Sequence, residues 1–222
     1  MNDSAFAELL RLTRLAFDAS DIKCQAEAQK TYWGYSICAT RILPGATLII
    51  GFNWGVGGKG TIYHAQQTQP TESFTVIRDK KELGSLARIV GRLNSYLPGA
   101  IENIGQSNFC FFRSPYARDI SPRDMETCIP LFFRFLELAQ PSRILCLSRQ
   151  LLQFFQDRGF LASIKQKQIT YAKGTKSTSI TVAKGDLRVK DGAIQIYFLP
   201  HPMAHLKKKV LDDCWAFCFG AP

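Results

Sequence analysis

The chain has 222 residues, of which 46% are hydrophobic and 12% aromatic, and its formal net charge at pH 7 is +10. This composition excludes a disordered chain and supplies enough apolar material for one core, so we expect a single domain over residues 1–222. No apolar run reaches the ~18 residues of a membrane span, and the first residues lack the features of a secretory signal. We therefore expect a cytoplasmic protein that does not contact a membrane.

Apolar periodicity predicts alternating helices and strands in the first half of the chain. Apolar residues at helical spacing indicate an amphipathic helix, continuous apolar runs indicate buried strands, and a segment with four glycines indicates a loop. The expected elements are a helix over 6–17, a strand over 46–52, a loop over 53–70, a helix over 79–97 and a strand over 107–112.

The second half continues the alternation, with a Ser-Pro pair at one helix start, a glycine after another helix and an Asp-Gly turn. The expected elements are a helix over 122–139, a strand over 143–148, a helix over 149–158, a hairpin of strands 178–189 and 193–199, and a closing helix from 203. Strands separated by helices predict an α/β fold with three αβα layers, in which helices flank a mainly parallel central sheet.

Seven cysteines are scattered along the chain. Cys110 and Cys146 lie in apolar runs, where a reduced cysteine acts as a small hydrophobe. The sequence has no Cys-x-x-Cys pair, and only Cys214 and Cys218 are close, at a helical spacing. A metal site or an iron–sulfur cluster would favour paired cysteines. We therefore interpret the thiols as buried or incidental and expect neither a metal nor a cofactor.

Positive charge is concentrated in two segments of the second half. Residues 161–190 hold seven Lys or Arg residues and one acidic residue, Asp186, and Lys207-Lys208-Lys209 follow shortly after. A solvated surface would explain either segment by itself. Because the second segment directly follows a candidate site at His201, the charge favours a polyanion as the partner, and nucleic acid in particular.

Three polar residues lie at the edges of apolar runs: Asn53, Asn108 and His201. Ligands of parallel sheets bind at the carboxyl ends of the strands, so we expect these side chains to line one pocket. Simpler interpretations also fit, because Asn53 would suit a turn cap and a lone histidine is more often a surface residue. Asn108 borders an apolar stretch, where an unpaired amide costs a few kcal/mol, so it needs a partner.

A phosphate-binding loop is another interpretation of the glycine-rich segment, because Gly58-Lys59 follows a strand. That motif requires a glycine five residues before the Gly-Lys pair and Ser or Thr directly after it. The chain has Asn53 and Gly60 at those positions, so the motif is not matched.

The three segments resemble the uracil-DNA glycosylase superfamily. The family has a Gly-x-Asn/Asp-Pro-type loop after the first core strand, an Asn after a later strand, and a His-Pro-Ser-type loop near the end. The chain is similar at Gly51-Phe52-Asn53-Trp54-Gly55, at Asn108-Phe109-Cys110 and at His201-Pro202-Met203-Ala204, over roughly residues 45–215. The middle motif looks most like the single-strand-selective monofunctional branch. Trp54 replaces the usual Pro, and Met203-Ala204 replace the usual Ser-Pro.

The resemblance implies a DNA glycosylase that flips out uracil or a related damaged base and hydrolyses its N-glycosidic bond. Asn53 would orient the attacking water, His201 would stabilise the departing base, and Asn108 would read the base edge. An amide matches uracil or cytosine by rotating, so selectivity requires a neighbour that fixes Asn108. The other expected contacts are Phe52, Trp54 and Tyr63 with the base, the last two being candidates to stack on it, and Ser114, Pro202, Met203, Lys207 and Lys208 with damaged DNA of one or two strands.

Two other functions fit parts of the sequence. Trp54 in the first motif is compatible with a non-catalytic protein of the same fold, which binds nucleic acid without cutting it. An unrelated α/β enzyme acting on a nucleotide or a phosphate metabolite would require the three similarities to be accidental. Excision of uracil from an oligonucleotide separates a glycosylase from both alternatives.

Overall fold

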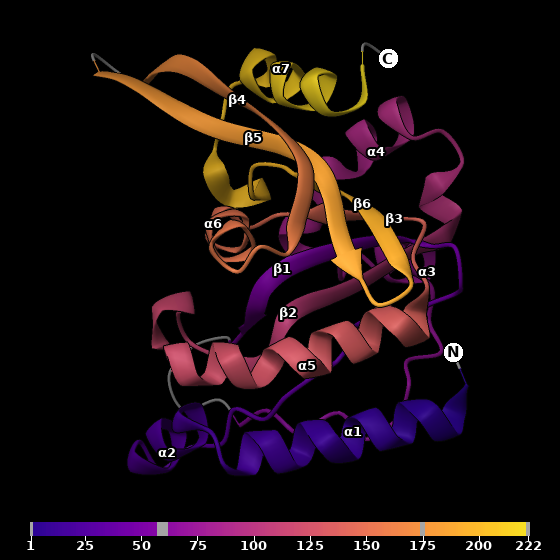
Figure 1. The fold of residues 1–222 in the computed structure, drawn as a ribbon, viewed down its shortest axis with the longest axis vertical. Coiled ribbons are helices and arrows are strands. Elements are labelled where there is room, and N and C mark those ends of the chain that lie inside the picture. The colour runs from indigo at the N-terminus through magenta and orange to yellow at the C-terminus, as the bar shows by residue number, and fades with distance from the viewer. Residues whose placement is uncertain (1, 57–61, 174–175, 221–222) are drawn as a thin grey trace.

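The computed structural model describes residues 2–56, 62–173 and 176–220, so Gly58-Lys59 lies outside the described residues. Six strands form one sheet in the order β2-β1-β3-β6-β5-β4 (Figure 1). β2, β1, β3 and β6 are parallel, and β5 and β4 are added antiparallel beside β6. The strands are β1 (Thr47–Gly55), β2 (Ile104–Ser114), β3 (Arg143–Cys146), β4 (Leu161–Lys173), β5 (Lys176–Val189) and β6 (Gly192–Phe198).

Helices cover both faces of the sheet, so the α/β fold with three αβα layers is confirmed. One core contains residues of α1 (Asp3–Asp18), α2 (Asp21–Ala28), α5 (Pro122–Ala139) and α6 (Arg149–Asp157). The other contains residues of α3 (Phe74–Asp79), α4 (Val90–Tyr96) and α7 (Lys208–Phe219). Shorter 3-10 helices are η1 (Gly84–Ile89), η2 (Ala100–Asn103), η3 (Ala117–Asp119) and η4 (Pro202–Ala204). In the described ranges, no helix is long and apolar enough to cross a membrane.

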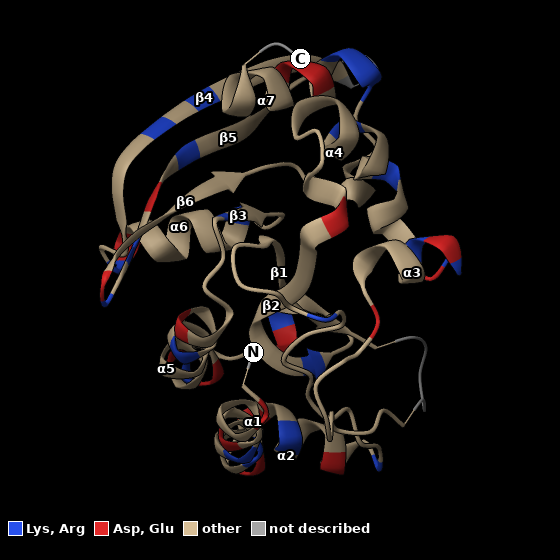
Figure 2. Cartoon of the chain, turned by 90° about the vertical axis from the view of Figure 1, so that its right-hand side faces the viewer, with Lys and Arg blue, Asp and Glu red and all other residues tan. Residues whose placement is uncertain are grey.

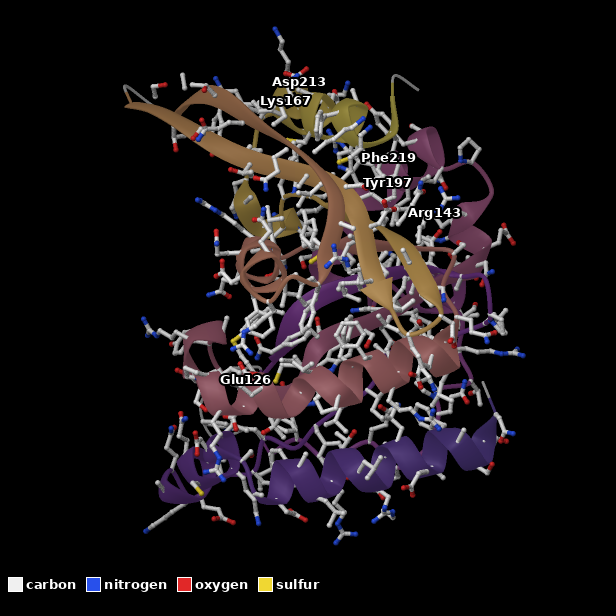
Figure 3. All side chains as sticks on the ribbon, viewed as in Figure 1. Glu126, Arg143, Lys167, Tyr197, Asp213 and Phe219 are labelled. Atoms are coloured by element: carbon white, nitrogen blue, oxygen red, sulfur yellow. The ribbon has the colours of Figure 1, made fainter. Side chains whose placement is uncertain are left out.

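The central strands are buried on both faces because they are nearly continuous apolar runs. In β1, Ile50 packs into the core with α1 and α5, whereas Ile49 packs into the core with α3, α4 and α7. On this second face, α7 lies against β6 through Phe219 and Tyr197, whose ring centroids are 4.5 Å apart (Figure 3). The sheet is thus a rigid support for side chains at its carboxyl edge.

Two expected elements differ at their ends. β1 continues through Gly55 instead of stopping at 52, so Asn53 lies within a strand and not in a loop. Instead of one helix over 79–97, the structure has η1 and α4, and α3 ends at Asp79, where the expected helix would begin. Lys81 after α3 and Gly84 at the start of η1 have positive φ angles of 62° and 55°, which a continuous right-handed helix does not allow.

The closing helix begins at Lys208 instead of 203, because His205 adopts a left-handed conformation with φ of 49° after η4. Two elements, α2 and β4, were not expected from the sequence. Residues 165–168 of β4 are all polar and exposed, since β4 is an edge strand with one neighbour. Such a strand lacks the alternation of apolar and polar residues by which strands are recognised.

The connections of β1 and β3 open a crevice at their carboxyl ends. From β1 the chain crosses to β2 through α3 and α4 on one face, whereas from β3 it enters α6 on the other face. Neighbouring parallel strands whose connections leave toward opposite faces form the usual ligand-binding crevice of α/β proteins.

A buried carboxylate joins α2 to α5. Asp124 is 1% exposed, and its oxygens accept hydrogen bonds from the backbone N–H groups of Asp21 at 3.0 Å and Ile22 at 3.2 Å. Asp124→Ala leaves these donors without this partner, so we expect the free energy of unfolding to fall by about 1–3 kcal/mol in urea titrations. Glu137→Ala, which removes an ion pair with Arg134 on the surface of the same helix, is the control and should change it by less than about 1 kcal/mol. Equal losses in the two variants would contradict this role.

Candidate active site

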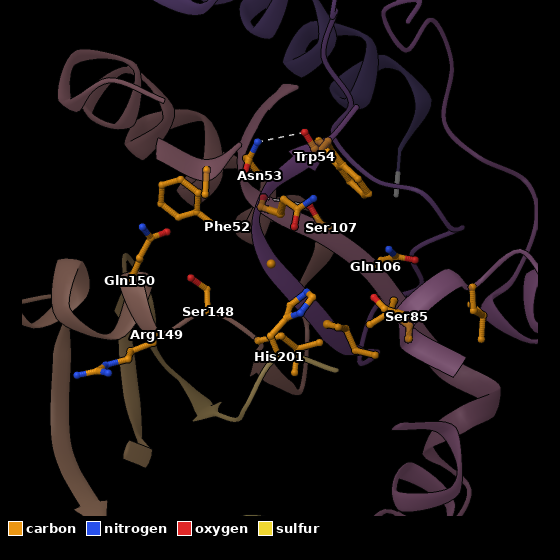
Figure 4. Close-up of a pocket in the computed structure, with 18 residues that line it drawn as sticks. Phe52, Asn53, Trp54, Ser85, Gln106, Ser107, Ser148, Arg149, Gln150 and His201 are labelled. Carbon is orange, nitrogen blue, oxygen red and sulfur yellow. Dashed lines mark hydrogen bonds between the residues drawn. The ribbon is translucent and has the colours of Figure 1, made fainter. Parts of the chain in front are cut away.

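A cavity of about 500 Å³ lies at the carboxyl ends of the parallel strands (Figure 4). Asn53 enters it from β1, Asn108 from β2, and His201 from the segment after β6. The expectation that these three side chains line one pocket is confirmed. The volume is within the range of cavities that bind small molecules or single bases.

Asn53 is held in one orientation by its amide nitrogen. Nδ2 donates to Oγ of Ser114 at 2.7 Å and to the carbonyl oxygen of Trp54 at 3.1 Å. An amide fixed through its nitrogen presents Oδ1 on the opposite side, and no residue in the described part of the chain donates to that oxygen. Oδ1 of Asn53 is therefore available to accept a hydrogen bond from a water or a ligand.

Ser114 does not contact phosphates, contrary to expectation. Its side chain is fully buried, and Oγ accepts from Asn53 while it donates to the carbonyl oxygen of Tyr116 at 2.7 Å. The hydroxyl of Ser114 is thus engaged in hydrogen bonds within the protein, once as acceptor and once as donor. Ser114 is thus a positioning residue for Asn53, which the sequence could not reveal because β1 and β2 bring the two together from 61 residues apart.

Asn108 lines the cavity with an amide that forms no hydrogen bond to the described residues. The residue is 7% exposed and is opposite Gly51 in the pairing of β1 with β2. Its side chain fills the space above Gly51, where an added Cβ would overlap Oδ1 of Asn108. No described residue forms a hydrogen bond with the amide. Because burial of an unpaired amide is costly, this geometry is typical of a group that binds a ligand.

The expected neighbour that fixes the rotation of Asn108 is not found among the described residues. Gly51 limits the position of the amide sterically, but it supplies no donor or acceptor to distinguish Oδ1 from Nδ2. Fixing the rotation of the Asn108 amide therefore requires another polar group of the lining, such as Ser148.

Gly51 is expected to tolerate no side chain. Gly51→Ala forces the Asn108 amide or β1 to move, so the free energy of unfolding should fall by about 1–3 kcal/mol. Gly55→Ala in the same strand is the matched control, because no described atom lies within 4 Å of its added Cβ. Urea unfolding of both variants tests this placement. A Gly51→Ala variant as stable as Gly55→Ala would show that Asn108 does not occupy this space.

His201 presents a neutral N–H donor at the rim of the cavity. Its Nδ1 accepts a hydrogen bond from the backbone N–H of Met203 at 3.2 Å. The proton of the neutral ring is then on Nε2, which becomes the donor. Although the residue as a whole is exposed, partial burial of the imidazole lowers the pKa of His201 and favours this neutral form.

The lowered pKa of His201 predicts a pH dependence of stability. The unfolded chain, with an ordinary histidine pKa of 6.5, binds the proton more tightly than the native state. The native state should therefore lose stability as the pH falls below 6.5, until the pH passes the lower native pKa. Urea unfolding at a series of pH values should show a smaller loss in His201→Ala than in the wild type. If the free energies of unfolding of the two proteins changed equally with pH, the lowered pKa of His201 would be contradicted.

Two of the three candidate aromatic residues, Trp54 and Tyr63, have their rings packed against Arg113. The guanidinium carbon of Arg113 lies 5.6 Å from the ring centroid of Trp54 and 5.1 Å from that of Tyr63. The indole of Trp54, which is 8% exposed, also donates to the carbonyl oxygen of Ser36. The described residues that line the cavity include Trp54 but not Tyr63, so the expected contact of Tyr63 with a base stays a prediction. Phe52 lines the cavity and is half-buried, which makes it the aromatic residue best placed to contact a ligand.

The other expected DNA contacts lie outside the cavity, around η4 and the start of α7. Met203 is 48% exposed, Pro202 is half-buried beside it, and Lys207 is exposed directly before α7. Nζ of Lys208 lies 3.3 Å from a carboxylate oxygen of Asp212, so its charge is partly compensated within the protein. Lys207 has no carboxylate partner among the described residues, so its charge is uncompensated next to that of Lys208.

Three lining residues after β3 were missed in the sequence. Ser148 begins α6 by accepting a hydrogen bond from the N–H of Leu151 at 3.3 Å, and Arg149 and Gln150 follow it into the cavity wall (Figure 4). Arg149 is exposed, and no carboxylate in the described part of the chain pairs with it. These residues also follow an apolar run, so the rule that identified Asn53 would have identified them.

The chain matches no known family model, and no curated protein is significantly similar to it. Within the described residues, no three His, Cys, Asp or Glu side chains are grouped as metal ligands would be. The function is therefore inferred from the residues of the cavity and their geometry.

Proposed function

We propose that the chain is a DNA glycosylase, which excises uracil or a related damaged base after base flipping and thereby acts in base excision repair. The observation that carries the proposal is the cavity shared by Asn53, Asn108 and His201. It combines an oriented acceptor for water, a buried amide with no hydrogen-bond partner among the described residues, and a neutral N–H donor. A DNA substrate agrees with the net charge of +10 and with the cytoplasmic location expected from the sequence.

In the proposed reaction, the bond between C1′ of the sugar and N1 of the base breaks, and its electron pair leaves with the base. Positive charge develops on the sugar and negative charge on the base. Nε2–H of His201 would donate to O2 of the base, in an interaction that strengthens as the bond breaks. A water bound to Oδ1 of Asn53 would add to C1′, and its proton would pass to the departed base.

The lining of the cavity suits a reaction that needs little general base catalysis. None of the described residues that line it is Asp or Glu. A sugar with oxocarbenium character accepts a weakly nucleophilic water once that water is placed correctly. The contribution required from Asn53 is therefore orientation, and its bond to Ser114 supports that role.

Base binding is proposed to involve Asn108 and Phe52. The Asn108 amide would accept from N3–H of uracil and donate to O4, so that both its donor and its acceptor would be hydrogen-bonded. Phe52 would contact the face of the base. Around the opening, Met203 and Pro202 would lie near the space vacated by the flipped base, and Lys207 near a phosphate.

A non-catalytic protein that binds nucleic acid is the second candidate. It is favoured by Trp54, whose buried side chain is fixed by Ser36 and Arg113 next to Asn53. Such a protein would use Asn108 and Phe52 to hold an unpaired base without breaking a bond.

An excision assay separates these functions. The substrates are end-labelled oligonucleotides with one uracil, single-stranded or paired, and matched oligonucleotides with thymine at that position. Alkali then cleaves the strand wherever a base has been removed. A glycosylase produces strand cleavage at the uracil. Binding without cleavage of any substrate would overturn the proposal and support the second candidate.

A further inference from the structure

The hairpin of β4 and β5 extends past the end of β6. β5 pairs with β6 only between Ala183, opposite Phe198, and Val189. Residues 176–182 of β5 and their partners 167–173 of β4 therefore project beyond the sheet, and we call them the arm (Figure 1). Because β6 ends at its carboxyl edge with Phe198, the arm projects on the side where the candidate active site lies.

A second cavity of about 260 Å³ lies between the arm and α6. We call it the arm groove, and it shares Leu147, Arg149 and His201 with the lining of the active-site cavity. The two cavities are therefore neighbours that meet at Arg149 and His201. A ligand that is longer than one nucleotide would continue from the first cavity into the second.

The arm groove has the chemistry of a site for a single base. Its lining includes the apolar residues Leu152 and Phe198, and the arm contributes Tyr171, Ser179 and Thr181. A flat base with polar edges fits these surfaces, since bases without partners stack on aromatic side chains. The bases of a duplex are already stacked on one another and cannot enter such a groove.

The charge around the arm is suited to a nucleic acid backbone. Residues 161–185 contain five lysines and no acidic residue. Figure 2 shows basic residues along β4 and β5, with acidic residues confined to the other end of the hairpin. Arg149 adds an exposed cation at the point where the two cavities meet.

We propose that the arm groove binds the unpaired nucleotide adjacent to the one whose base occupies the active-site cavity. Its base lies against Tyr171, and the phosphate between the two nucleotides lies near Arg149. This inference rests on the nucleic-acid binding in the proposed function but does not require bond cleavage. It assigns the arm as a binding element for single-stranded DNA.

Binding of single-stranded oligonucleotides tests the assignment. The probes contain a central uracil, and in two further probes the nucleotide on its 5′ or 3′ side lacks a base. Tyr171→Leu should weaken binding of the complete probe about tenfold or more, as expected for loss of one stacked base. Tyr171→Phe, which keeps the ring, should bind like the wild type. For one of the two abasic probes, the wild type and Tyr171→Leu should bind equally.

The proposed contact between Arg149 and a phosphate is tested by the salt dependence of the same oligonucleotide binding. Arg149→Gln should reduce the slope of log Kd against log salt by about 0.7, which corresponds to one phosphate contact on a single strand. Lys190→Gln is the control, because Lys190 is exposed at the opposite end of β5. Its slope should decrease by less than that of Arg149→Gln.

The outcomes distinguish a failure of the arm assignment from a failure of the proposed function. If Tyr171→Leu binds every probe like the wild type, the assignment of the arm is overturned while the proposed glycosylase stands. If the wild type binds no oligonucleotide, both are overturned. Urea unfolding of Tyr171→Leu and Tyr171→Phe separates a loss of binding from a loss of folding.

Discussion

We expect replacement of His201 by Ala to lower single-turnover excision of uracil by the proposed glycosylase about 10²–10³-fold, because one donor to a developing oxyanion is removed. Nε2–H of His201 is available because Nδ1 accepts from Met203. The hydrogen bond to the base strengthens mainly in the transition state, so binding of an uncleaved oligonucleotide should be nearly unchanged. Rapid-quench kinetics and fluorescence anisotropy measure the two quantities.

His205→Ala is the matched control for this prediction. His205 is exposed four residues after His201 and is not among the described residues that line the active-site cavity. Its variant should excise uracil at the wild-type rate. If His201→Ala also does so, His201 has a structural role and the proposed stabilisation of the departing base is wrong.

Replacement of Asn108 by Asp reverses part of the hydrogen-bonding pattern at the bottom of the cavity. A carboxylate accepts from N3–H of uracil but faces O4 with a second acceptor, whereas it can accept from N4 of cytosine. In a site as buried as Asn108, such a mismatch is worth a few kcal/mol. We expect uracil excision to fall by about 10²-fold or more and the ratio of uracil to cytosine excision to fall with it.

Gln106→Glu provides the matched change from amide to carboxylate, because Gln106 lines the same cavity two residues earlier in β2. It should lower the ratio of excision rates less than Asn108→Asp does, since Gln106 is less buried. An unchanged ratio in Asn108→Asp would show that this residue does not read the base.

The fold could be predicted from the sequence where burial determines it. The apolar runs of β1, β2 and β3 are buried on both faces, so they are recognisable without knowledge of their neighbours. β4 was missed because residues 165–168 are polar, and its pairing is determined by β5 instead of by a buried face. The break between α3 and α4 depends on backbone conformations at Lys81 and Gly84 that composition does not fix.

The candidate site could be predicted in part, for a related reason. Asn53 and His201 are marked locally by the apolar runs before them and Asn108 by the apolar run after it, and the parallel strands bring all three to one cavity. The roles of Ser114 and Tyr63 depend on contacts with Asn53 and Arg113, which are distant in sequence. Those contacts arise only from the pairing of β1 with β2 and from the path of the loop after β1.

The most direct test of the central claim is a crystal structure of the protein with an oligonucleotide that contains 2′-fluoro-2′-deoxyuridine. The fluorine disfavours positive charge on the sugar and so preserves the N-glycosidic bond. The account predicts that the uracil lies in the active-site cavity, with O2 within about 3 Å of Nε2 of His201 and the base edge hydrogen-bonded to Asn108. A uracil that remains stacked in the strand, or that binds elsewhere on the protein, would contradict it.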